Sequence, residues 1–266
     1  MIKVTHFPKK ARQTAAFFTI FSCLGLVGCS STPQGDLATD KKILSSCPTT
    51  QIAADAQIDT SGSVRATEVP EAYAGALKAL VRRTAVCGGH LRIGAFSATA
   101  ASTVTLYDGD LQMPGSTENA RLRRVPQAAD DVWKTVNGAY AQKAASLNPG
   151  GTDVVAQYRL AHEYVQQLGG TRQLDLLLLT DGFHNTGFVL GDRALADAEA
   201  KALAAQADVR PLPGARITVA GIGKTAGQDS APTDIITGMK VFYDALCQRT
   251  GAAACTSVTD YTPTGG

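Results

Sequence analysis

The chain has 266 residues, of which 25 are basic and 23 acidic, and 44% of its residues are hydrophobic. Its first 28 residues contain four basic residues and no acidic one, so the remainder carries 21 basic against 23 acidic residues. Such a balance speaks against nucleic acid as a partner, because nucleic-acid binding needs a basic surface. The length is sufficient for one large domain with a sizeable core.

The N-terminal segment has the layout of a secretory signal. Residues 1–14 carry the basic side chains, and residues 15–28 form an apolar run that is too short to span a bilayer. The run ends in "LVGC", which resembles the lipobox of bacterial lipoproteins. In that class the signal is cut before the cysteine, which then carries lipids, so Cys29 is the expected lipidation site. The alternatives are an ordinary signal peptide and an apolar N-terminal helix.

This N-terminus predicts an exported protein that is anchored to a membrane through its lipid alone. It would face the periplasm or lie at the outer membrane of a Gram-negative cell, or on the outer face of a Gram-positive cell membrane. Residues 29–46 are rich in Ser, Thr, Pro and Gly, which is typical of a flexible tether. We therefore expect a signal peptide at 1–28, a tether at 29–46 and one folded domain at 47–266.

Strand-like and helix-like segments alternate along the predicted domain. The expected strands cover residues 50–59, 90–98, 102–109, 173–182, 215–223 and 255–261. The expected helices cover residues 68–86, 127–147, 153–168, 192–207 and 232–251. This alternation predicts an α/β fold with a doubly wound, mostly parallel six-stranded sheet and helices on both faces.

Four cysteines fall within the predicted domain, and an even number in an exported protein favours disulfides over metal ligation. Cys47 and Cys87 each precede a strand, and these two strands should be neighbours. Cys247 ends a helix, and Cys255 begins the last strand. We therefore prefer the pairs Cys47–Cys87 and Cys247–Cys255 among the three possible connectivities.

Three polar stretches fall where predicted strands end or a helix begins, namely "DTSGS" at 59–63, "GGTD" at 150–153 and "LLTDG" at 178–182. In a doubly wound sheet, ligands bind at the carboxyl ends of the strands. The side chains that could bind a ligand there are all oxygen donors: Asp59, Ser61, Ser63, Thr152 and Asp181. Such donors suit Mg²⁺, which prefers about six oxygens and keeps several of its waters.

In this order, and at these element ends, the three stretches resemble the metal-ion-dependent adhesion site of the von Willebrand factor A domain family. The resemblance covers the chain from about residue 50 onward. It implies that Ser61 and Ser63 bind the cation directly, and that Thr152 binds it directly or through water. It also implies that Asp59 and Asp181 bind the cation through water or directly. The cation would be Mg²⁺, or Mn²⁺ or Ca²⁺, and an Asp or Glu of a protein partner would complete its coordination.

Other interpretations remain open, since single Asp and Ser residues commonly cap helices and turns. The domain could be a metal-independent scaffold subunit of an envelope assembly. A metal-dependent hydrolase is a further alternative, but Ser61 lacks a nucleophile elbow and no local motif provides a histidine base, so we do not expect an enzyme. The segment 221–227, "GIGKTAG", lacks the first glycine of a phosphate loop because position 218 is Thr, so no nucleotide is expected.

Two features qualify the comparison with that family. The first predicted strand contains Asp55 and Gln57, which share a side with Asp59, whereas a solid apolar run is usual there. A charge buried at position 55 would need a partner. Near the third polar stretch, we expect His184 to be a surface-loop residue, and the alternative is a position beside the metal rim where it could contact a ligand.

Overall fold

The computed structural model describes residues 35–64, 68–225 and 230–261. The predicted signal peptide and the predicted lipidation site Cys29 lie outside these ranges. Within them, no helix combines the length and apolarity that crossing a membrane would require.

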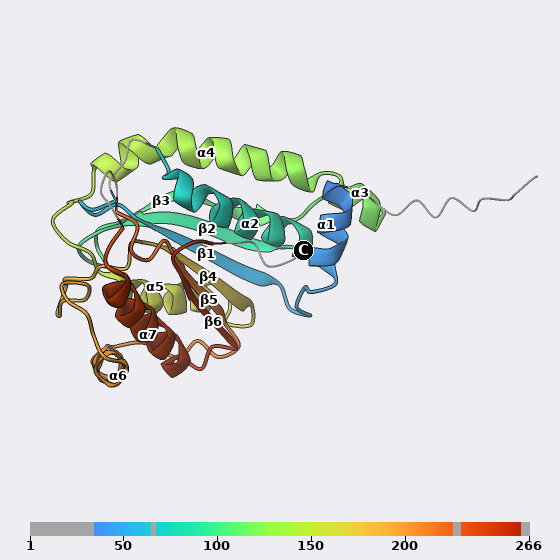
Figure 1. Cartoon of the computed structure of the whole chain (residues 1–266). Coiled ribbons are helices and arrows are strands. Elements are labelled where there is room, and N and C mark those ends of the chain that lie inside the picture. Colours follow the sequence, from blue (N-terminus) through green and yellow to red (C-terminus); the bar gives the residue numbers. More distant parts are fainter. Residues whose placement is uncertain (1–34, 65–67, 226–229, 262–266) are drawn as a thin grey trace, which may run out of the picture. The chain divides into compact units, whose positions relative to one another are not determined.

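The strands form one six-stranded sheet in the order β3-β2-β1-β4-β5-β6 (Figure 1). They are β1 Ile52–Asp59, β2 Gly89–Phe96, β3 Thr103–Leu111, β4 Gln173–Leu179, β5 Arg216–Ala220 and β6 Ala254–Val258. All neighbouring strands are parallel except β2 and β3. The chain first builds outward from β1 through β2 to β3 and then returns to the other side of β1 with β4. The strand order therefore reverses at β1 and β4, which is the switch point where ligands bind in such sheets.

Helices cover both faces of the sheet, which confirms the predicted doubly wound α/β fold. They are α1 Asp36–Leu44, α2 Glu71–Cys87, α3 Glu118–Leu122, α4 Val125–Ala145, α5 Val154–Gln167, α6 Asp197–Gln206 and α7 Thr233–Arg249. Figure 1 shows α1, α2 and α4 on one face and α5, α6 and α7 on the other. Each face buries its own apolar cluster: Ile52 and Ile58 of β1 point to the first, and Leu176 and Leu178 of β4 to the second. Successive side chains of a strand alternate between faces, so both faces of these central strands are buried.

Helix α1 corrects the prediction of a flexible tether up to residue 46. Its Asp40 is fully buried, and the Oδ1 atom accepts a hydrogen bond of 2.6 Å from Nε of Arg82 in α2. Arg82 also forms an ion pair of 2.9 Å with Asp36. Charge pairs therefore help to hold the helix to α2, together with Leu37, Ile43 and Leu44, which pack against the first apolar cluster. The folded part already includes Gly35 and does not begin near Cys47.

Both predicted disulfides are present. Cys47 and Cys87 are joined with their Cα atoms 5.4 Å apart, which ties the segment after α1 to the end of α2. Cys247 and Cys255 are joined with their Cα atoms 5.9 Å apart, which ties α7 to β6. The two disulfides, the two apolar clusters and the whole sheet lie in one compact unit that spans residues 33–266.

The charge in the first strand has the partner that it needs. Asp55 is fully buried, and its two oxygens accept hydrogen bonds of 3.0 and 2.7 Å from Nε and Nη2 of Arg92, which lies opposite it on β2. Gln57 Nε2 donates to the same carboxylate at 2.6 Å. The Arg92 guanidinium also donates to the carbonyl of Leu160 in α5 and lies 4.1 Å from the ring centre of Tyr164. The polar residues of β1 thus connect β1, β2 and α5 beneath the sheet edge where the candidate site lies.

Candidate metal centre

The edge formed by the ends of β1 and β4 brings two of the predicted ligands together. Asp59 is the last residue of β1, and Asp181 follows the end of β4 by two residues. Ile58 pairs with Leu179 in the parallel register, so the next residues of both strands meet. Thr180 Oγ1 accordingly donates a hydrogen bond of 2.7 Å to Asp59 Oδ2. Both carboxylates are fully buried at the switch point.

The turn after β1 adds the two serine hydroxyls. The Ser61 N–H donates to Asp59 Oδ1 at 2.8 Å, which folds the chain back over the carboxylate. Ser61 Oγ then lies 3.2 Å from Ser63 Oγ, as the alternation in D-x-S-x-S predicts. The Gly62 N–H donates to the carbonyl of Pro149 at 3.0 Å, so this turn is linked to the second polar stretch.

The loop before α5 places Thr152 at the same edge. Its N–H donates to Asn185 Oδ1 at 2.8 Å, and its carbonyl accepts from the Asn185 N–H at 3.2 Å. Gly151 permits this approach, because a Cβ there would lie 2.9 Å from the Cβ of Ala98. Thr152 is buried, and within the described ranges its hydroxyl makes no hydrogen bond to the other four predicted ligands. The structure therefore places the loop of Thr152 at the same sheet edge as the other four residues.

The two carboxylates resist ionisation in the absence of a cation. Burial raises the pKa of Asp59 to about 6, against the lowering effect of the hydrogen bonds from Ser61 and Thr180. Burial, followed by the charge of Asp59, raises the pKa of Asp181 to about 7, although the Ser63 hydroxyl and the Phe183 N–H counteract this. No basic side chain from the described part of the chain compensates either group. Two buried carboxylates with raised pKa values form an environment that favours a bound positive charge.

The donor set fits a small hard cation. Asp181 Oδ2 is buried and has no hydrogen-bond partner among the residues that the structure describes, so an acceptor is available. No group of three or more His, Cys, Asp or Glu suited to a metal occurs in the described ranges, because the cluster has only two carboxylates and its other donors are hydroxyls. An all-oxygen set with few charges is compatible with Mg²⁺, which keeps part of its water shell.

Two tyrosines pack close to the carboxylates and keep this region dry. Tyr243 donates a hydrogen bond of 2.8 Å to the carbonyl of Gly182, next to Asp181. Tyr73 is buried, and its hydroxyl has no hydrogen-bond partner within the described ranges. Burial, with further contributions from the charges of Asp59 and Asp181, raises the pKa of both phenols well above the usual value. Both tyrosines therefore stay neutral and add no negative charge to the site.

Three residues of the site were not predicted in these positions. Thr180 supports Asp59, and its place directly before Asp181 in "LLTDG" was an available signal. Asn185 holds Thr152, and no sequence pattern pointed to it. His184 is only 1% exposed, so the expectation of a surface-loop histidine is wrong. Its Nε2–H donates to the Thr186 carbonyl at 2.7 Å, and burial lowers the pKa of its ring.

The loop that follows Asp181 contains apolar side chains. Phe183 and Phe188 are half-buried, and Val189 is 57% exposed. The Phe188 ring lies 4.3 Å from that of His184, so the buried histidine supports this loop from below. The Phe188 ring also lies 5.6 Å from that of Phe242 in α7, so this loop is anchored to the second apolar cluster.

The fold and this edge together define a doubly wound α/β domain with a hydroxyl and carboxylate cluster at its switch point. No protein-family model matches the chain, and no curated protein matches it significantly. Among solved structures, it is similar to the open conformation of the pilus adhesin SpaC from Lactobacillus rhamnosus GG, with 12% identity over 81% of this chain and a TM-score of 0.41. A second crystal form of the same adhesin gives 11% identity over 80% of this chain and a TM-score of 0.39. The chain spans 28% and 29% of the length of these two adhesin chains.

Proposed function

We propose that this protein is an exported, lipid-anchored component of the cell envelope whose von Willebrand factor A-like domain binds a protein partner through a divalent cation. The cation would be Mg²⁺, or Mn²⁺ or Ca²⁺, and an Asp or Glu of the partner would complete its coordination. One observation carries the proposal: Asp59 and Asp181 are buried side by side without a described basic partner, next to two serine hydroxyls.

Each residue of the cluster has a separate task in this proposal. Asp59 is held by the Ser61 N–H and the Thr180 hydroxyl, so its oxygens are already oriented before a ligand arrives. Ser61 and Ser63 contribute neutral oxygens, which leave the charge of a cation incompletely neutralised. When bound, the cation supplies the positive charge that compensates the two aspartates and attracts a carboxylate of the partner.

The binding face surrounds this cluster. The exposed Gly62 and Asn185 belong to loops that meet at the edge, and the loop of Asn185 continues to the exposed Val189. A partner that places a carboxylate on the cation and also contacts Val189 would bury apolar area in addition to pairing charges. Such a combination would give both specificity and affinity.

The proposal is tested by isolating partners from an envelope extract with the full-length protein as bait. We expect the Asp59→Ala variant, and the wild type in chelator, to lose the same partner that the Asp130→Asn variant retains. Asp130 is an exposed residue of α4 and serves as the matched control. Circular dichroism checks that the variants fold. Capture that survives both chelation and Asp59→Ala would contradict the proposal and would indicate a metal-independent scaffold instead.

A further inference from the structure

We propose that the end of the domain opposite the candidate metal centre lies against an anionic phospholipid surface, and that a pocket at this end receives a phosphate headgroup. The orientation of this end toward the membrane rests on the lipid anchor of the proposed function. It does not depend on the metal centre.

The end in question is formed by α1 and α3, which are neighbours (Figure 1). Strand β1 begins near this end at Ile52 and finishes in the metal centre at Asp59. A strand rises by about 3.3 Å per residue, so roughly 25 Å of strand separates the two ends. A ligand at one end would therefore leave the other end free.

Basic side chains gather on these two helices and directly after α3. We call the following set the basic end: Lys41, Lys42, Arg121, Arg123 and Arg124. All are exposed except Lys41, which is half-buried, and within the described ranges none of them forms an ion pair. The acidic residues Asp36 and Asp40 of α1 are already paired with Arg82, and the exposed Glu118 of α3 offsets one of the five positive charges. The basic end therefore still carries an excess of positive charge, which attracts anionic lipid.

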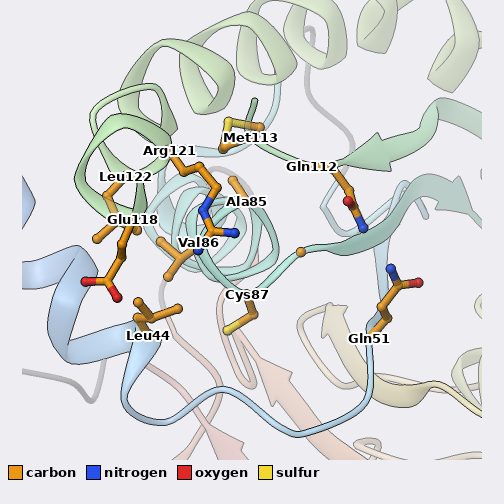
Figure 2. Close-up of a pocket in the computed structure, with 11 residues that line it drawn as sticks. Leu44, Gln51, Ala85, Val86, Cys87, Gln112, Met113, Glu118, Arg121 and Leu122 are labelled. Carbon is orange, nitrogen blue, oxygen red and sulfur yellow. The ribbon is translucent and has the colours of Figure 1, made fainter. Parts of the chain in front are cut away.

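A pocket of about 280 Å³ opens at this end (Figure 2). Figure 2 shows the Arg121 guanidinium directed into it beside Val86, with the amides of Gln51 and Gln112 on the other side. The carboxylate of Glu118 lies near Leu44, away from the guanidinium.

The lining combines the chemistry that a phospholipid headgroup requires. A guanidinium pairs with a phosphate through charge-assisted hydrogen bonds. Amides can donate to and accept from the hydroxyls of a glycerol group. The aliphatic side chains of Leu44, Val86 and Leu122 provide a wall for the first carbons of the acyl chains. The pocket therefore matches a glycerophospholipid better than a free anion, which would leave this wall unused.

The length of the N-terminal segment brings this end close to the membrane. Only residues 30–34 separate Cys29 from Gly35, where the described part begins. At about 3.4 Å per residue, the chain between these two positions spans at most roughly 20 Å. With Cys29 lipidated, α1 is thus held near the bilayer, and the metal centre at the far end of β1 points toward a partner.

The test measures co-sedimentation of the chain from Ser30 to Gly266 with vesicles, in chelator. This chain lacks the lipid but contains the whole compact unit with both disulfides. We expect it to bind vesicles that contain phosphatidylglycerol, to bind pure phosphatidylcholine only weakly, and to dissociate in high salt. Equal binding to both vesicle types would overturn the inference. The outcome is independent of the proposed metal binding, because chelator is present throughout.

Variants assign the binding to the basic end. Lys42→Gln with Arg123→Gln should weaken binding to the phosphatidylglycerol vesicles roughly 30-fold, since each basic residue near the surface contributes about fivefold. The matched control is Lys201→Gln with Arg210→Gln, which removes two exposed charges elsewhere. Equal losses in the two double variants would show that net charge alone is responsible, and would refute the assignment.

The pocket is tested separately with Arg121→Lys. This variant keeps the positive charge but removes the planar guanidinium, which can donate two parallel hydrogen bonds to a phosphate. We expect soluble glycerol phosphate to compete with vesicle binding by the wild type and to lose this effect on the variant. If glycerol phosphate competes equally with both proteins, or with neither, the pocket does not receive the headgroup. Thermal unfolding monitored by circular dichroism confirms that each variant is folded.

Discussion

The substitution Asp181→Asn should stabilise the metal-free domain while abolishing its response to Mg²⁺. An unfolded Asp ionises near pH 3.8, whereas the pKa of folded Asp181 is raised to about 7. Between these values the folded state holds a proton that the unfolded state has lost, so the free energy of unfolding falls as the pH rises. Asn cannot ionise and therefore escapes this loss.

The raised pKa of Asp181 sets the size of the change in the free energy of unfolding. A difference of about 3 pKa units corresponds to about 4 kcal/mol, which is fully expressed above about pH 7 and nearly absent at about pH 4. For a domain of this size, this should raise the melting temperature of Asp181→Asn by roughly 10 °C over wild type at about pH 8. In excess Mg²⁺ the wild type should recover much of the difference, because a ligand at 100 times its Kd contributes about 2.7 kcal/mol.

The measurement is thermal unfolding at several pH values, in chelator and in Mg²⁺. The exposed Asp130→Asn is the control, and it should follow the wild type under every condition. Two results would refute the reasoning. One is an Asp181→Asn variant that melts with the wild type at about pH 8 in chelator. The other is a stabilisation of this variant by Mg²⁺ as large as that of the wild type.

Two further predictions concern the scaffold. Arg92→Ala leaves the buried Asp55 carboxylate without its partner and should cost about 3–5 kcal/mol in urea unfolding; a cost below about 1 kcal/mol would show that the pair is not needed. Replacing Cys47–Cys87 by serines opens a loop with a sequence separation of 40 and should cost about 4 kcal/mol. The same change at Cys247–Cys255, with a separation of 8, should cost roughly 2.5 kcal/mol, and the reverse order of these two losses would contradict the loop argument.

The sheet could be predicted because its strands and helices have distinct sequence patterns. The run of aliphatic residues in β4 is typical of a strand buried on both faces, and β4 lies at the centre of the sheet. The helices α2, α4 and α7 bury the apolar stripes that their sequences contain. The pairing of Cys47 with Cys87 could also be predicted, because each cysteine precedes one of two neighbouring strands. Parallel neighbours begin at the same edge of a sheet, so the two cysteines lie close together.

Helix α1 was not predicted because its few apolar residues are interrupted by charged ones, and charge pairs contribute to its attachment. Asp40 is buried beside Arg82, and burial raises the pKa of this carboxyl against the opposing effect of Arg82. The sequence of the helix, DLATDKKIL, is also rich in charged residues, so its composition resembles that of a polar tether. Which aspartate of such a segment meets which arginine depends on a contact between residues that are 42 positions apart.

The candidate site was predictable to the extent that its ligands follow strands. Asp59 and Asp181 could be placed because they end parallel strands, and Ser63 because it alternates with Ser61. The roles of Thr180 and Asn185 depend on contacts with residues that are 121 and 33 positions away. The burial of His184 likewise results from the bridge between His184 and Leu190, which local sequence does not specify.

The distribution of charge explains why net charge was a poor guide to surfaces on this protein. The chain beyond residue 28 has 21 basic and 23 acidic residues, and this balance speaks against nucleic acid as a partner. The structure separates two groups of ionisable residues: Asp59 and Asp181, which have no basic partner in the described part of the chain, are buried at one end of β1, and the basic end lies at the other. Roughly 25 Å of strand lies between them, so a ligand at one end would not contact a ligand at the other. A cation and an anionic surface would therefore not compete for the same residues of this domain.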